Sequence, residues 1–195
     1  MNLPNKLTML RVLLIPIMII FLMKEYYSAA AAVFMAASIT DAFDGHIARS
    51  RNLITDFGKL MDPLADKLLV VSALVCLVQL GDVQGWMVIV ILAREFLITG
   101  LRGVAASSGK VIAAAKSGKL KTITQMLAVI LILLKNFPCW PFTAMGIKPG
   151  TVMLWIAVFM TVYSGVEYVL KNGEVFRDMR SEEHTSELQS RVSIS

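Results

Sequence analysis

Long apolar segments alternate with short polar ones along most of this chain. Several of the apolar segments approach the roughly 20 residues that a helix needs to cross a membrane. The pattern predicts six spans, and they cover residues 7–23, 28–40, 67–80, 86–106, 119–136 and 151–170. Residues 1–6 are expected to form an interfacial segment, and the second span is expected to continue helically into the region of Asp41. The predicted fold class is an all-α integral membrane protein with six transmembrane helices.

The composition supports this class. Of the 195 residues, 56% are hydrophobic and 17% are charged, and the mean hydropathy is +0.68. These values are typical of integral membrane proteins rather than soluble domains. The net charge of +5 suits an anionic membrane surface or nucleic acid, and the hydrophobicity favours the membrane. No nucleic-acid partner is expected. Cys76 and Cys139 have no metal-ligand spacing and are expected to be packing residues.

Lysine and arginine set the expected orientation. If the N-terminus is cytoplasmic, most of the cations fall on the cytoplasmic side, and the outer side carries only Lys24, Lys135 and Lys148. Six spans with both termini in the cytoplasm fit this distribution. The predicted location is a cell membrane that the chain crosses several times, with the polar residues between the second and third spans facing the cytoplasm.

The composition changes sharply near residue 180. Residues 180–190 resemble the translation of a common sequencing-library adapter, so the natural chain is expected to end near Met179. The predicted organisation is a single membrane domain at residues 1–179, followed at residues 180–195 by a non-native or disordered polar tail.

Four carboxylates are concentrated between the second and third spans. Asp41 and Asp44 are three residues apart, and Asp62 and Asp66 are four apart, so each pair shares a helix face. Carboxylates that converge at a membrane edge repel one another unless a cation binds them. Hard oxygen ligands suit Mg²⁺ or Mn²⁺. By themselves, such acids also fit an ion pathway in a small cation transporter, or structural pairing with arginine.

The spacing of these acids narrows the choice. The stretch reads Asp-x2-Asp-Gly-x2-Ala-Arg-x8-Gly-x3-Asp-x3-Asp, and its fixed positions are Asp41, Asp44, Gly45, Ala48, Arg49, Gly58, Asp62 and Asp66. It resembles the signature of the CDP-alcohol phosphatidyltransferase family. The resemblance implies two divalent ions, Mg²⁺ or Mn²⁺, with Asp41, Asp44 and Asp62 as ligands. Asp66 would share the second ion and act as the general base. The resemblance also implies a homodimer.

The resemblance further implies a nucleotide site. Gly45, Ala48, Arg49 and Gly58 would line the site for the cytidine diphosphate, where small residues let a ligand approach the backbone closely. Asn5, Thr8 and Arg11 share a helix face near the N-terminus and resemble a family feature beside the nucleotide. Asparagine and threonine are also common helix caps, so this second group is a weaker signal.

A third group of residues points to the acceptor substrate. Arg94 and Arg102 lie about two helical turns apart in the fourth span, and Lys116 and Lys119 follow. With their neighbours they resemble the family members that use sn-glycerol 3-phosphate, and arginine binds phosphate bidentately. The resemblance then implies transfer of the phosphatidyl group of CDP-diacylglycerol to the 1-hydroxyl of sn-glycerol 3-phosphate, which releases CMP. Inositol phosphate, serine or phosphatidylglycerol remain alternative acceptors. Alternatively, the cations merely follow the positive-inside rule, which explains Arg94 poorly because it lies inside an apolar span.

Overall fold

The structure is a computed structural model that describes the backbone of residues 3–51, 56–107, 116–134 and 148–192. Side chains are described for residues 9–40, 64–65, 67–106, 117–134 and 148–173. Within these backbone ranges the chain forms six helices and no strand, which confirms the predicted all-α fold. The helices are α1 (Leu3–Met23), α2 (Tyr27–Arg51), α3 (Asp56–Gln79), α4 (Gly85–Ser107), α5 (Lys116–Leu133) and α6 (Pro149–Val192).

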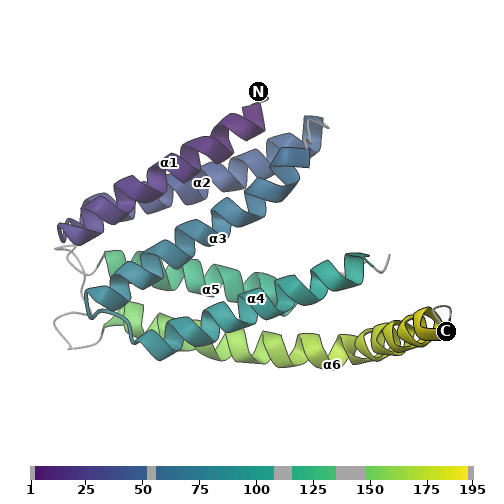
Figure 1. Cartoon of the computed structure of the whole chain (residues 1–195). Helices are drawn as coiled ribbons and strands as arrows, with labels where there is room; N and C mark the ends of the chain where they lie inside the picture. The colour runs from purple at the N-terminus through teal and green to yellow at the C-terminus, as the bar shows by residue number, and fades with distance from the viewer. Residues whose placement is uncertain (1–2, 52–55, 108–115, 135–147, 193–195) are drawn as a thin grey trace.

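Successive helices run in opposite directions, so every second connection lies at the same end of the bundle (Figure 1). The start of α1, the end of α2 and the start of α3 lie at this end, and so do the end of α4 and the start of α5. We call it the motif end, and it carries Leu3, Arg51, Asp56, Ser107 and Lys116. All the segments singled out in the sequence therefore belong to helices that have one end there.

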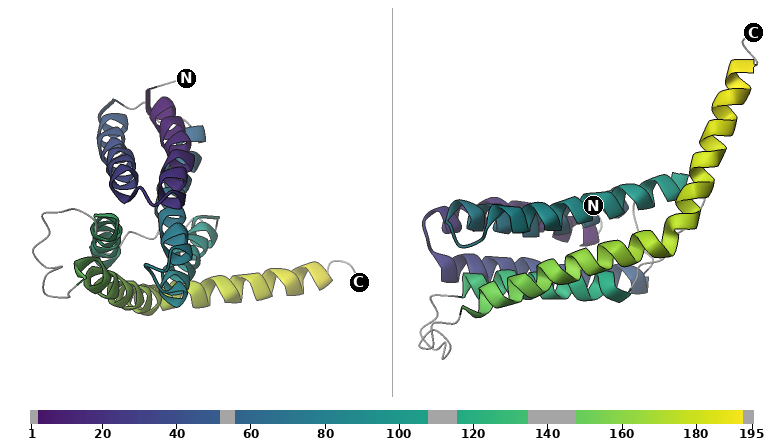
Figure 2. Two further views of the ribbon diagram at one scale, coloured as in Figure 1. Left: turned by 90° about the vertical axis from the view of Figure 1, so that its left-hand side faces the viewer. Right: turned by 90° about the horizontal axis from the view of Figure 1, so that it is seen from below.

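The helices form two packed groups. Helix α1 packs against α2 and α3, and α6 packs against α4 and α5. The groups meet where α2 contacts α5 and where α3 contacts both α4 and α5, and Figure 2 shows one group stacked on the other. Helix α3 thus brings its end of the aspartate motif next to the helices that carry the predicted acceptor residues.

Small side chains allow these helices to approach closely. Ala30, Ala31, Phe34 and Ala37 of α2 are fully buried and recur at helical spacing, so the alanine-rich face of α2 is used inside the bundle. Between α5 and α6, a Cβ atom at Gly150 would lie 2.6 Å from Cγ1 of Ile132, a separation that real Cβ contacts do not show. Glycine is therefore required at position 150 for the observed packing of α6 on α5.

Large apolar side chains also cover the outside of the bundle. Ile89, Phe96, Phe159 and Leu170 are each at least 67% exposed, as expected for side chains that face lipid. Among the described residues, one helical stretch, Pro149–Gly173, is long and apolar enough to span a membrane. Shorter apolar helical stretches are Met9–Met23, Tyr27–Thr40 and Lys67–Gln79. Six transmembrane helices therefore remain a prediction.

Three expectations differ from the observed boundaries. The predicted interfacial segment is not separate, because α1 already begins at Leu3. Residues 52–57, between the second and third predicted spans, have a composition that predicts a turn, but Asp56 and Phe57 form the first residues of α3. Helix α6 continues to Val192, through residues expected to form a separate tail (Figure 2). The native or adapter origin of residues 180–195 stays a prediction. Cys76 is buried and free, as expected of a packing residue, whereas Cys139 lies outside the described residues.

Candidate active site

The backbone brings both halves of the aspartate motif to the motif end. Asp44 lies seven residues before the end of α2, and Asp62 lies six residues after the start of α3. Because the two helices are antiparallel and adjacent in the chain, both positions are about 10 Å from the connection between them. Asp41 and Asp66 lie roughly one turn further along their helices. This register is the one that a shared acidic site requires.

The side chains of these aspartates lie outside the described ones, so their roles as ligands and base stay predictions. The same holds for the side chains of Asn5, Thr8, Gly45, Ala48, Arg49, Gly58 and Lys116, whose backbones are helical wherever they are described. No group of three or more His, Cys, Asp or Glu side chains occurs elsewhere among the residues with described side chains. The aspartate motif is therefore the candidate metal centre.

Arg11 is the described member of the predicted nucleotide group, and only 2% of it is exposed. Burying a guanidinium is costly unless it is paired. Arg11 lies on α1, which packs against both α2 and α3. The fold thus places a buried cation on the helix that packs against the two helices carrying the aspartate motif.

A network of charged and polar side chains connects α3, α4 and α5. The carboxylate of Glu95 on α4 accepts a hydrogen bond from Lys121 on α5 and forms an ion pair with it. Lys121 is only 1% exposed. Glu95 Oε1 also lies 3.6 Å from Nη1 of Arg94. Lys67 of α3 donates to the hydroxyl of Thr99, and that hydroxyl donates to the backbone carbonyl of Glu95 at 2.7 Å. The Glu95 carboxylate therefore pairs with Lys121 and Arg94, and its backbone carbonyl is linked to Lys67 through Thr99.

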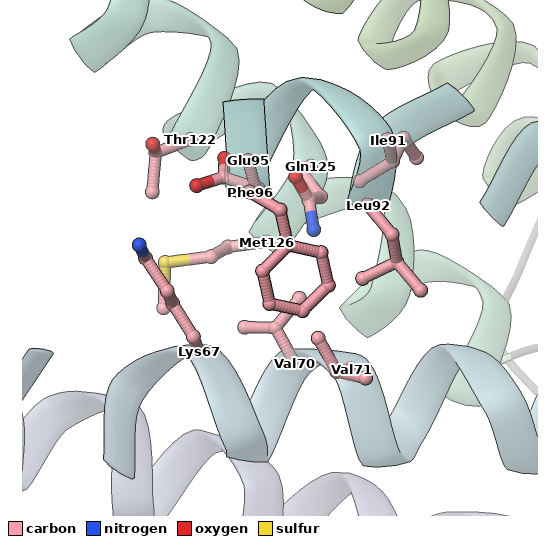
Figure 3. Close-up of a pocket in the computed structure, with 10 residues that line it drawn as sticks. All are labelled: Lys67, Val70, Val71, Ile91, Leu92, Glu95, Phe96, Thr122, Gln125 and Met126. Carbon is pink, nitrogen blue, oxygen red and sulfur yellow. The ribbon is translucent and has the colours of Figure 1, made fainter. Parts of the chain in front are cut away.

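This network borders a cavity of about 170 Å³ between α3, α4 and α5. Figure 3 shows the polar ends of Lys67, Glu95 and Thr122 on one side, and Ile91 and Leu92 on the other. The cavity is therefore amphipathic. Its polar side includes Lys67, the residue that directly follows the motif residue Asp66.

The side chain of Arg94 packs between two glycines. Cβ atoms at Gly118 of α5 and Gly165 of α6 would lie 3.3 Å from Nη2 and 3.4 Å from Cγ of Arg94. Its side chain is 14% exposed. Its guanidinium pairs with the neighbouring carboxylate of Glu95. Its predicted role in binding the acceptor is not tested by the pairing, but the guanidinium does reach the start of α5.

Arg102 lies over the ring of Tyr168 of α6, with 5.5 Å between Cζ and the ring centroid. This is cation–π geometry. Arg94 is near enough to Arg102 for their like charges to repel. The two predicted acceptor arginines therefore belong to one group, shared between α4 and α6. Lys119, in contrast, is exposed at the surface of α5.

The sequence reasoning gave no site role to Lys67, Glu95 or Tyr168, and it counted Lys121 only as further positive charge beside Lys116 and Lys119. A signal existed for Lys121, because it shares a helix face with Thr124, Gln125 and Ala128, which are all buried. Lys119 is two residues away and so faces nearly the opposite direction. No comparable signal marked Tyr168, whose burial depends on the packing of α6 against α4.

Comparison with known proteins agrees with the motif. Residues 1–163 match the model of the CDP-alcohol phosphatidyltransferase family. A Bacillus subtilis protein named CDP-diacylglycerol–glycerol-3-phosphate 3-phosphatidyltransferase is 46% identical over 191 residues, which cover 90% of this chain and 97% of the relative. A Rickettsia typhi protein of the same name is 40% identical, with 86% of this chain and 94% of the relative covered. A Mycobacterium tuberculosis protein named probable phosphatidylglycerophosphate synthase is 39% identical, with 87% and 81% covered. The chain belongs to the CDP-alcohol phosphatidyltransferase family.

Proposed function

We propose that this protein transfers the phosphatidyl group of CDP-diacylglycerol to sn-glycerol 3-phosphate and produces phosphatidylglycerophosphate and CMP. The observation that carries the proposal is the complete aspartate motif on α2 and α3, at the same end of the bundle as the cations of α4 and α5. The names of the Bacillus and Rickettsia relatives support the same donor and acceptor.

The donor set of the motif suits divalent cations. Asp41, Asp44, Asp62 and Asp66 offer hard carboxylate oxygens, which bind Mg²⁺ or Mn²⁺ in preference to softer metals. In the proposed site these four residues would hold two such ions. Asp41, Asp44 and Asp62 would be ligands, and Asp66 would share in binding the second ion. When bound, divalent ions neutralise the charge of a pyrophosphate and of the departing phosphate.

The proposed reaction is a direct displacement at phosphorus. The 1-hydroxyl oxygen of glycerol 3-phosphate forms a bond to the phosphorus that carries the diacylglycerol. The bond from that phosphorus to the bridging pyrophosphate oxygen breaks, and CMP leaves with the electron pair. Asp66 accepts the hydroxyl proton, as a carboxylate within hydrogen-bond reach can do. Positioning of the two substrates supplies most of the rate.

The remaining predicted residues bind the cytidine diphosphate of the donor and the phosphate of the acceptor. Gly45, Ala48, Arg49 and Gly58 line the site for the cytidine diphosphate, and Asn5, Thr8 and Arg11 approach it from α1. Arg94 and Arg102, with Lys116 and Lys119, form the acceptor phosphate site. The contacts of Arg94 and Arg102 support their part in this arrangement, and the exposure of Lys119 makes it the weakest member.

The same proposal places the protein in the membrane. The helices cross a bacterial cytoplasmic membrane six times, with both termini and the motif end in the cytoplasm, and two copies form a homodimer. The exposed apolar side chains and the span-length stretch Pro149–Gly173 support this placement. At the opposite end of the bundle, the rings of Trp86 and Trp155 lie 5.4 Å apart, as expected in an aromatic belt at a membrane interface.

CMP release by the purified protein tests the proposal. The assay uses micelles that contain CDP-diacylglycerol, with glycerol 3-phosphate, serine, inositol phosphate or phosphatidylglycerol as acceptor, and with or without Mg²⁺ or Mn²⁺. Metal-dependent release with glycerol 3-phosphate alone is expected. Release with a different acceptor would keep the displacement and overturn the acceptor. If a folded protein releases CMP with none of them, the proposed reaction is wrong, and metal flux into liposomes would then test a transporter.

A further inference from the structure

We propose that the cavity between α3, α4 and α5 binds one anionic phospholipid of the surrounding membrane. Lys67 binds the phosphate of this lipid, Gln125 donates a hydrogen bond to one of its ester carbonyls, and one acyl chain enters the apolar part of the cavity. The lipid is neither the donor nor the acceptor of the proposed reaction. The inference therefore rests on the proposed membrane placement and not on the proposed chemistry.

The first observation is the order of polarity along the cavity. Lys67 and Thr122 are the lining residues nearest the motif end on α3 and α5, and Glu95 lies beside them on α4 (Figure 3). Val71 and Ile91 lie four residues further along their helices from that end, or about 6 Å. The cavity is therefore polar toward the proposed cytoplasmic side and apolar toward the middle of the membrane.

The second observation is a buried amide without a partner. Gln125 of α5 is 6% exposed and lines the cavity, and Figure 3 shows its amide between the polar and the apolar lining residues. No hydrogen bond joins this amide to any other residue that the structure describes. Leaving a buried amide unpaired is costly. A ligand carbonyl that accepts a hydrogen bond from Gln125 removes this cost.

The third observation is the charge at the polar end of the cavity. The ammonium of Lys67 donates to the hydroxyl of Thr99, and two of its three N–H groups are left for another acceptor. The nearby carboxylate of Glu95 is already paired with Lys121 and Arg94. These three cations and one carboxylate leave an excess of two positive charges among the described side chains. An anionic group with several oxygens, such as a phosphate, matches both the charge and the spare donors.

The size of the cavity suits part of a lipid. Its volume is about 170 Å³, and an apolar cavity of about 150 Å³ holds a benzene molecule, so a segment of one acyl chain fits inside. Phe96 lines the cavity and is itself exposed, so the cavity lies directly beneath the surface that faces lipid. The remainder of the lipid lies along the outer face of α3 and α4, where Leu68 and Leu97 are exposed.

A phospholipid carries its groups in the same order as the cavity. Its phosphate lies at the membrane surface, its ester carbonyls lie beneath the phosphate, and its hydrocarbon lies deepest. The cavity presents a cation, then an amide, then apolar side chains. A zwitterionic headgroup would bring an ammonium group toward Lys67, whereas an anionic headgroup would not. Basic pockets between membrane helices on the cytoplasmic side bind anionic headgroups in this way.

Photo-crosslinking tests the inference. The full-length protein is placed in phosphatidylcholine nanodiscs with a small fraction of phosphatidic acid that carries a diazirine in one acyl chain. Phosphatidic acid is anionic, and it is neither the proposed donor nor one of the acceptors in the CMP assay. We expect labelling of the peptides that contain Val71 and Met126, which line the cavity. A phosphatidylcholine with the same diazirine should label these peptides more weakly.

Variants of the two polar residues sharpen the test. In Lys67→Gln, labelling by sub-saturating phosphatidic acid should fall about tenfold, because a hydrogen bond to a charged group is lost. Gln125→Leu should also reduce the labelling, but by a smaller factor because its hydrogen bond is neutral. The matched controls are Lys171→Gln and Gln79→Leu, since both residues are exposed and neither lines the cavity. Both controls should keep the labelling of the wild type.

Several outcomes would overturn the inference. Equal labelling by the two lipids, or unchanged labelling in folded Lys67→Gln and Gln125→Leu proteins, would show that the cavity does not select an anionic phospholipid. Loss of the labelling on addition of unlabelled CDP-diacylglycerol would assign the cavity to the donor substrate instead. CMP release by the same nanodiscs keeps the two proposals apart. Labelling without CMP release would support the lipid site and count against the proposed reaction, whereas CMP release without labelling would overturn the lipid site alone.

Discussion

Helices α2 and α3 contribute all four motif aspartates to the motif end, whereas α4 and α5 contribute five cations and the single carboxylate of Glu95. The two pairs of helices are therefore suited to different tasks. Carboxylates attract divalent ions, which suits the pyrophosphate of a nucleotide donor. Arginine and lysine bind a phosphate directly. In the proposed reaction, donor activation and acceptor recognition therefore belong to consecutive parts of the chain.

The acids themselves also differ in how they are paired. Glu95 connects two helices through a lysine that is 1% exposed. Glu167 pairs with Lys171 four residues away on the same helix, and the lysine side chain is 66% exposed. The same two residue types thus form an interhelical contact in one place and a surface pair in the other. Only the first can position a neighbouring arginine.

The largest effect is expected at the aspartates. Asp62→Asn removes a carboxylate from the proposed metal centre, so turnover should fall below detection while the melting temperature is kept. CMP release and thermal unfolding measure the two quantities. Asp56→Asn is the matched control, because Asp56 lies on the same helix and outside the motif. Near-normal turnover of the Asp62 variant would show that α2 and α3 do not provide the metal centre that distinguishes them from α4 and α5.

The next largest effect is expected at Glu95. Glu95→Gln leaves the buried ammonium of Lys121 without a counter-charge, and such a loss costs about 3 kcal/mol when the carboxylate is only partly exposed. The melting temperature should fall, and the KM for glycerol 3-phosphate should rise because Arg94 loses its neighbour. Glu167→Gln makes the same chemical change in a pair whose lysine side chain is 66% exposed, and it should leave both quantities unchanged. Equal shifts in the two variants would show that burial does not distinguish these pairs.

A smaller effect is expected at Gly118. Gly118→Ala would place a methyl group 3.3 Å from Nη2 of Arg94, so the guanidinium must move by a few tenths of an ångström. We expect a KM for glycerol 3-phosphate raised by about threefold, or ~0.7 kcal/mol. Gly103→Ala is the control, because a Cβ there meets nothing within 4 Å. A KM that is unchanged in the Gly118 variant would show that Arg94 adapts without loss.

No effect is expected from removing the last 15 residues. Residues 181–192 continue α6 away from the bundle (Figure 2), and neither pair of helices in the comparison includes them. The truncated protein should keep its turnover, both KM values and its melting temperature. Lost activity in the CMP assay would show that this segment belongs to the working protein.

Much of the fold was predictable because apolar runs separated by polar turns determine where helices form. Four of the six predicted spans lie inside observed helices. The third and fifth spans were predicted to extend further, but residue 80 follows the last residue of α3 and residue 134 follows the last residue of α5. The boundaries were less predictable. Asp56 and Phe57 resemble turn residues locally but join α3, because the packing of a helix and not its local composition decides how far it extends.

The candidate site divides in the same way. The sequence determined the aspartate motif by itself, because residues three and four apart share a helix face once the segment is helical. It also determined the family, and it identified Arg94 as an unusual charge within an apolar span. Composition could not show which of two nearby lysines is buried. The structure shows that Lys121 is buried and Lys119 is exposed.

Tertiary structure alone decided which charges meet. The sequence contains Glu95, Lys121 and Lys67 in three separate segments, and only the packing of α3, α4 and α5 brings them together. Tyr168 lies 66 residues after Arg102 in the chain, and only the contact between α4 and α6 brings its ring under that arginine. The physical reason is that helix periodicity fixes neighbours within about two turns, whereas contacts between helices depend on side-chain packing along their whole length.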